Sequence, residues 1–170
     1  MAESQGIFHL TSASDLFGCL RVALSRYQKA ESKRIEDAFF LVMGANHLRE
    51  WIALGYNPKF NKKKVPSPAP NSEAEKFYIE IFDNDDFKIV QALCNRAKHL
   101  TASCGLTDFS GDLSIDEWDL PIDDVVDFDE GPPTGFYVDG QEIGSILHRL
   151  LEVYRDEWFE HQRSSSASAV

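Results

Sequence analysis

The stretch from residue 33 to 54 is apolar on nearly every side when it is wound into an α-helix. At about 100° per residue, Ile35 and Phe39 fall on one side, whereas Phe40 and Trp51 fall roughly opposite. A helix that is apolar nearly all round is buried. The chain must therefore supply other helices that surround this one, and we predict that it is the central helix of a helical domain.

Four further segments carry apolar residues at the spacing of an amphipathic helix. These segments are residues 12–30, 73–82, 86–103 and 143–161. Ser12 or Ser14 can cap the first of them, and Gly105 is a stop signal for the third. Together with residues 33–54, they predict a bundle of four to five helices.

A loop rich in proline and lysine is expected between residues 56 and 72, because three of its prolines fall within five residues. Its lysines are candidates for contact with an anionic partner, RNA included, although such a cluster is also typical of a solvated loop. The cluster consists of Lys59, Lys62, Lys63 and Lys64.

The net charge of −11 comes from one part of the chain. No lysine or arginine lies between His99 and His148, and that stretch carries twelve acidic residues. Such a segment repels nucleic acid and suits a basic partner. Its candidate binding residues are Asp123, Asp124, Asp127 and Asp129.

The same acidic stretch predicts a small sheet, since apolar and acidic residues alternate and Asp139-Gly140 is a hairpin signal. Acidic residues also protect the edge of a sheet from aggregation, so their charge has an alternative explanation.

We therefore expect a mainly α fold, a helical bundle with a small acidic β-hairpin or sheet inserted before the last helix. Residues 1–163 are predicted to form a single domain, with the β insert near 106–142 and a flexible tail at 164–170. The N-terminus has no signal-peptide pattern, and no apolar run is long enough for a membrane span. Three scattered cysteines argue against a disulfide framework, so we predict a cytoplasmic protein without membrane contact.

Two groups of polar residues are candidates for function. Asn95, Lys98 and His99 share one side of the helix predicted at 86–103, where they could hold a phosphate and move a proton. The alternative interpretation is that these three residues form the solvated face of an amphipathic helix. Asn46 and His47 lie on the central helix, where His47 could meet His99 across two helices. The alternative is that these polar residues make a hydrogen bond within the core.

Neither a metal nor a cofactor is expected. His47, His99 and His148 fall on three predicted helices, but no paired-ligand spacing supports a metal site. The chain also has no glycine-rich phosphate loop and no nucleophile signature.

The run Asn95-Arg96-Ala97-Lys98-His99 resembles the polar–Arg–His motif of HEPN-type proteins. It also resembles an N-x-x-K-H pattern of uncharacterised bacterial and prophage-type proteins. The first resemblance implies a compact all-helical ribonuclease that acts as a dimer. In it, His99 would be the acid–base group, while Asn95, Arg96 and Lys98 would contact phosphate.

Two functions follow as hypotheses. Only Ala97 and Lys98 separate Arg96 from His99, fewer residues than in the HEPN motif, and no complete catalytic constellation is present. We therefore expect a non-catalytic protein-interaction module of a bacterial or phage defence or regulatory system, with a protein partner or a second copy. The alternative is an HEPN-like ribonuclease, for which the negative net charge gives no support.

Overall fold

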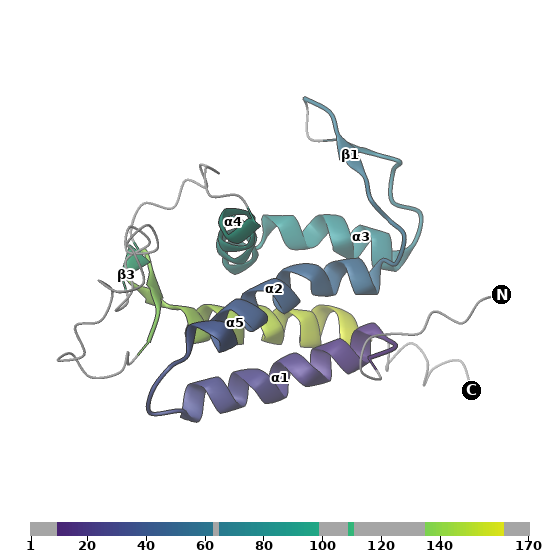
Figure 1. Cartoon of the computed structure of the whole chain (residues 1–170). Helices are drawn as coiled ribbons and strands as arrows, with labels where there is room; N and C mark the ends of the chain where they lie inside the picture. Colours follow the sequence, from purple (N-terminus) through teal and green to yellow (C-terminus); the bar gives the residue numbers. More distant parts are fainter. Residues whose placement is uncertain (1–9, 63–64, 99–108, 111–134, 162–170) are drawn as a thin grey trace.

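The computed structural model describes residues 10–62, 65–98, 109–110 and 135–161. These residues are mainly helical, as the sequence predicts (Figure 1). The long helices are α1 (Ala13–Lys29), α2 (Ile35–Ile52), α4 (Asp85–Lys98) and α5 (Ile143–Tyr154). A short helix, α3 (Glu73–Glu80), leads through the 3-10 turn η2 (Ile81–Asp83) into α4, and α5 continues as the π-helical η5 (Arg155–Glu160). No helix in the described part of the chain is long and apolar enough to cross a membrane.

Helix α1 begins where the sequence predicts it. The Ser12 hydroxyl accepts a hydrogen bond from the Asp15 amide, and the Asp15 carboxylate accepts one from the Ser12 amide. This reciprocal capping box satisfies amides that a helix start leaves unpaired. Hydrogen bonds from the Thr11 amide, and from the Ser12 and Thr11 hydroxyls, hold the pKa of Asp15 below its usual value. Of the two predicted caps, Ser12 is therefore the one used.

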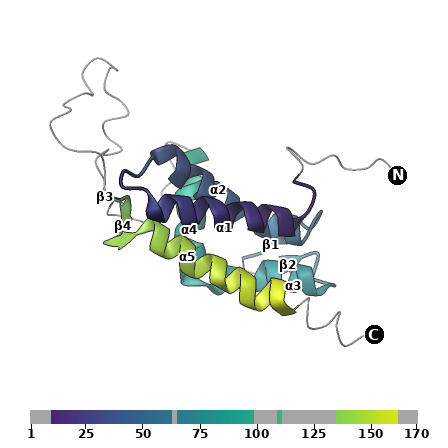
Figure 2. The same ribbon diagram turned by 90° about the horizontal axis from the view of Figure 1, so that it is seen from below.

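Helix α2 lies in the middle of the bundle, with α1 and α5 on one side and α3 and α4 on the other (Figure 1). Viewed from below, α1 and α5 run side by side (Figure 2). The core between these helices is made of large apolar side chains. Those that are fully buried include Leu20, Leu41, Leu48, Phe87, Val90, Ile146, Leu147, Leu150 and Tyr154.

Helices α1 and α2 approach each other closely at Gly44. A Cβ atom at this position would lie 2.5 Å from Cδ2 of Leu20, which is fully buried. The absence of a side chain at Gly44 therefore sets how near the two helices pack.

The predicted β insert is present as a three-stranded antiparallel sheet in the order β3-β4-β5. Its strands are β3 (Phe109–Ser110), β4 (Tyr137–Val138) and β5 (Gln141–Glu142). Asp139 and Gly140 form the β4–β5 turn with φ angles of 47° and 74°. Positive φ at both positions is typical of the tight hairpin turn that the Asp-Gly pair predicts.

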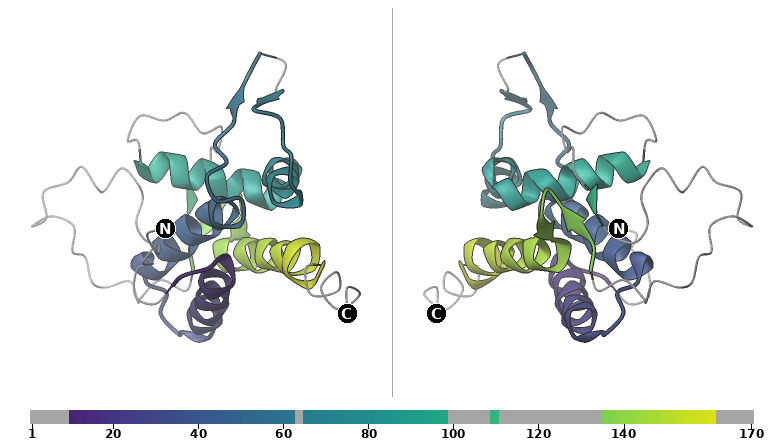
Figure 3. Two further views of the ribbon diagram at one scale, coloured as in Figure 1. Left: turned by 90° about the vertical axis from the view of Figure 1, so that its right-hand side faces the viewer. Right: turned by 90° about the vertical axis from the view of Figure 1, so that its left-hand side faces the viewer.

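One expectation about the fold needs correction. The stretch 56–72, predicted as an irregular loop, contains a second antiparallel pair, β1 (Lys59–Phe60) with β2 (Pro66–Ser67). A proline at the edge of a two-stranded ribbon costs no ladder hydrogen bond if its nitrogen faces outward, so Pro66 is compatible with the pairing. This β1–β2 hairpin projects away from the helices (Figure 3).

Candidate interaction surface

The outward side of α2 is apolar and exposed to solvent. Phe39 is 51 % exposed and Phe40 is 42 % exposed. At about 100° per residue, Phe40 and Trp51 lie 100° and 120° round the helix from Phe39, and not opposite it as the sequence analysis expected. Met43 and His47 fall between them and are partly exposed. We call this set the α2 face: Phe39, Phe40, Met43, His47 and Trp51.

The prediction that α2 is buried nearly all round is therefore wrong on this side. The neighbouring helices cover the opposite arc, which holds Ala38, Leu41, Ala45 and Leu48. Single exposed apolar residues are normal on a protein surface, whereas larger apolar patches mark contact sites. Met43 and Trp51 pack partly against the core, so Phe39 and Phe40 are the exposed apolar part of the α2 face.

Carboxylates lie within and beside the α2 face: at about 100° per residue Glu36 and Glu50 fall inside its arc and Asp37 falls next to it. The His47 imidazole pairs with the Glu50 carboxylate, with 2.8 Å between Nδ1 and Oε2. The Arg34 guanidinium donates to Glu36 across 3.0 Å, and this hydrogen bond keeps the pKa of Glu36 below its usual value. Asp37 is exposed next to Glu36. Glu36 and Glu50 are thus each paired within the chain, and Asp37 is a further exposed carboxylate beside the α2 face.

Asn46 lies on the buried side of α2 and is only 4 % exposed, as the sequence predicts. Within the described part of the chain, its Oδ1 atom has no hydrogen-bond partner. The core hydrogen bond predicted for Asn46 is therefore not made by this oxygen among the described residues. Asn46 lies in the interior of the bundle.

Arg49 is a second buried polar residue, which the sequence reasoning did not single out. It is 6 % exposed, and its guanidinium carbon lies 4.1 Å from the ring centre of Phe82, 4.6 Å from Tyr78 and 4.8 Å from Phe87. Among the residues that the structure describes, no carboxylate pairs with Arg49, and its Nε and Nη1 atoms have no hydrogen-bond partner. Burial lowers the pKa of Arg49. The aromatic cage, not an ion pair, accommodates this cation.

The structure brings together only part of the Asn95–His99 group. On α4, Asn95 is exposed and Arg96 is half-buried. The preceding residue, Cys94, is buried with its Sγ atom 3.3 Å from Sδ of Met43 on α2. The side chain of Lys98 and all of His99 lie outside the described residues, and so does the proposed meeting of His47 with His99.

The remaining candidates are divided between exposed positions and undescribed ones. Lys59 and Lys62 are exposed on the β1–β2 hairpin, and His148 is exposed on α5. Lys63 and Lys64 fall outside the described residues, and so do Asp123, Asp124, Asp127 and Asp129. In the ranges that the structure describes, no three His, Cys, Asp or Glu side chains gather as a metal site would require.

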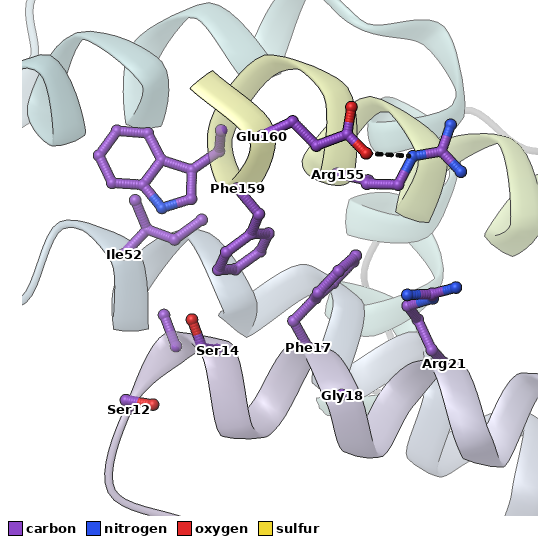
Figure 4. Close-up of a pocket in the computed structure, with 11 residues that line it drawn as sticks. Ser12, Ser14, Phe17, Gly18, Arg21, Ile52, Arg155, Phe159 and Glu160 are labelled. Atoms are coloured by element: carbon purple, nitrogen blue, oxygen red, sulfur yellow. Dashed lines mark ion pairs between the residues drawn. The ribbon is translucent and has the colours of Figure 1, made fainter. Parts of the chain in front are cut away.

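A groove between the start of α1 and η5 is a further feature that the sequence reasoning missed (Figure 4). It encloses about 760 Å³. Phe17 and Phe159 stack in it with their ring centres 4.4 Å apart, and Arg21 lies 5.8 Å from the Phe17 ring. Arg155 at its rim pairs with acidic neighbours, including Glu160 at 3.6 Å. The groove joins residues from the two ends of the sequence, and no local pattern signals such a pairing.

A comparison of this chain with models of known protein families finds no match, and comparisons with curated proteins and with solved structures find none either.

Proposed function

We propose that this chain is a non-catalytic protein-interaction module and that the α2 face is its contact surface. The observation that carries the proposal is the half-exposed pair Phe39 and Phe40 on the central helix. Aromatic side chains and methionine are enriched in interfaces, and a few aromatic anchors often carry most of the binding free energy.

The rest of the surface supports the same conclusion. Carboxylates lie among and beside the apolar side chains of the α2 face, and its one histidine is paired with Glu50. This arrangement suits recognition of a protein that presents lysines or arginines among its apolar side chains. Such a partner gains both apolar burial and charge complementarity.

The double variant Phe39→Ser/Phe40→Ser is expected to lose at least about tenfold in affinity for a captured partner, because each truncated aromatic anchor costs on the order of 1 kcal/mol or more. The matched control is Val22→Ser/Leu54→Ser, which removes two exposed apolar side chains outside the α2 face. Affinity is measured by surface-immobilised binding, and circular dichroism verifies that both variants fold. Equal loss of binding in the two variants would overturn the assignment.

An HEPN-like ribonuclease is the second candidate. The exposure of Asn95 in the last turns of α4 favours it, since a phosphate contact needs an accessible side chain. The expected result under this candidate is cleavage of a mixed RNA panel by the parent, lost in His99→Ala and kept in His148→Ala. RNA left intact over varied pH and metal conditions would remove this candidate.

A further inference from the structure

The groove between α1 and η5 has the size and the lining of a small-molecule site. It encloses about 760 Å³, within the range of about 300–1,000 Å³ that is typical of ligand pockets. Its centre is aromatic, because Phe17 of α1 and Phe159 of η5 stack there and Trp158 lines the same groove. Phe17 is buried, but Trp158 and Phe159 are only half-buried. A ligand can therefore cover aromatic surface that the described residues leave open.

The helix that carries Trp158 and Phe159 has an unusual backbone. η5 is π-helical over Arg155–Glu160, and none of its residues is buried. π-helical turns are rare in proteins, and many of them lie at functional sites. Trp158 and Phe159 pack partly against the core and also line the groove. The two rings thus stand where the core meets the groove.

The charges that line the groove are unevenly paired. They belong to three side chains: Arg21, Arg155 and Glu160. Arg155 is shared by carboxylates of its own helix, with its Nε atom 2.7 Å from Asp156 and 3.6 Å from Glu160. Arg21, on α1, is exposed and forms no ion pair with any carboxylate that the structure describes. Arg21 is therefore the charge in the groove that an anionic ligand can neutralise.

Arg21 lies at one end of the groove. Its guanidinium carbon is 5.8 Å from the ring centre of Phe17, and the stacked rings separate it from Ile52 at the other end (Figure 4). A guanidinium binds a carboxylate through two parallel N–H groups. A ligand held in this way has its charged group at Arg21 and its apolar body along the rings. The lining thus matches a compound with a negative charge at one end.

We propose that the groove binds a small molecule that has a flat aromatic body and one carboxylate. Arg21 holds the carboxylate, while Trp158 and Phe159 contact the aromatic body through offset or edge-to-face packing. Gly18 leaves room for the ligand, since it lines the groove and a Cβ atom there would meet nothing within 4 Å. This site goes beyond the proposed function and shares no residue with the α2 face.

The test uses naphthoate and naphthamide, which have the same aromatic body and differ in charge. Equilibrium dialysis measures the dissociation constant of each compound for the full chain at low and at high salt. At low salt we expect naphthoate to bind about threefold to tenfold more tightly than naphthamide, because an ion pair with an exposed arginine contributes a modest free energy. High salt is expected to reduce this preference, since salt screens exposed charges.

Two variants separate the charge from the space. Arg21→Gln is expected to remove the preference for naphthoate, whereas the control Arg26→Gln, at an exposed position of the same helix, keeps it. Gly18→Leu fills part of the groove and is expected to weaken both compounds at least about tenfold. Its control is Gln28→Leu, which adds the same side chain at an exposed position of α1 outside the groove lining. Thermal unfolding verifies that all four variants fold.

Three results would overturn the proposal. The first is failure of both compounds to bind the parent, and the second is equal affinity of the parent for the two. The third is unchanged binding in folded Gly18→Leu. Phe39→Ser/Phe40→Ser is expected to bind both compounds as the parent does, so a loss confined to that variant would instead move the site to the α2 face. Because the groove and the α2 face share no residue, each proposal can fail without the other.

Discussion

Replacing Arg49 with methionine is expected to raise the free energy of unfolding by about 1–2 kcal/mol. Burying a cation without a paired carboxylate costs several kcal/mol, whereas its contacts with aromatic rings return roughly 2 kcal/mol. The Nε and Nη1 atoms, which have no hydrogen-bond partner in the described part of the chain, add to the cost. Methionine has a similar reach and no charge, and its sulfur packs well against the edges of Tyr78, Phe82 and Phe87.

Arg49→Ala is the comparison that separates charge from packing. It also removes the charge, but it leaves the cage empty, and truncations of this kind typically cost about 2–4 kcal/mol relative to a side chain that fills the space. Urea unfolding of the parent, Arg49→Met and Arg49→Ala measures their free energies of unfolding. We expect Arg49→Met to be the most stable of the three, and the parent to be as stable as Arg49→Ala or more stable. A methionine variant less stable than the parent would show that the cage contributes more than the burial of charge costs.

The second large effect concerns the contact between Leu20 and Gly44. Leu20→Ala is expected to cost about 2–5 kcal/mol, since this side chain is fully buried between α1 and α2. Gly44→Ala is expected to cost about 1–3 kcal/mol, because its new methyl group would lie 2.5 Å from Cδ2 of Leu20. In the double variant Leu20→Ala/Gly44→Ala, the clash is absent and the new methyl group fills part of the space that Leu20 leaves. Its loss of unfolding free energy is therefore expected to be about 1–2 kcal/mol smaller than the sum of the two single losses.

Gly18 on α1 provides the control for this cycle. No atom lies within 4 Å of a Cβ at this position, so Gly18→Ala is expected to stabilise the helix by about 0.5–1 kcal/mol. Thermal unfolding measures all four variants. Additive effects of Leu20→Ala and Gly44→Ala would contradict the close approach of α1 and α2.

Helical periodicity predicted the helices well because each one buries a stripe along its length. Leu16, Leu20 and Leu24 are buried on α1, and Ile146, Leu147 and Leu150 are buried on α5. Turn chemistry was equally informative at Asp139-Gly140, where the pair of positive φ angles requires residues of this kind.

The α2 face could not be predicted in the same way. The sequence of α2 shows that apolar side chains lie on nearly every side of the helix. Which of those sides is covered depends on how many helices pack around α2 and where they lie. Among the described elements, α1, α3, α4 and α5 pack on α2 and leave Phe39 and Phe40 exposed. Arg49 was missed for a related reason: its cage comes from α3, η2 and α4, and no local pattern in α2 signals it.

Photo-crosslinking shows whether the α2 face contacts a protein partner. A photo-reactive amino acid is placed at Phe40 in one variant and at Val22 in a second, both exposed apolar positions on a helix. We expect irradiation in cells to join the Phe40 variant to a discrete protein, whereas the Val22 variant yields no such product. Crosslinks of equal yield and identity from both positions, or none from Phe40, would contradict the α2 face as the interaction surface.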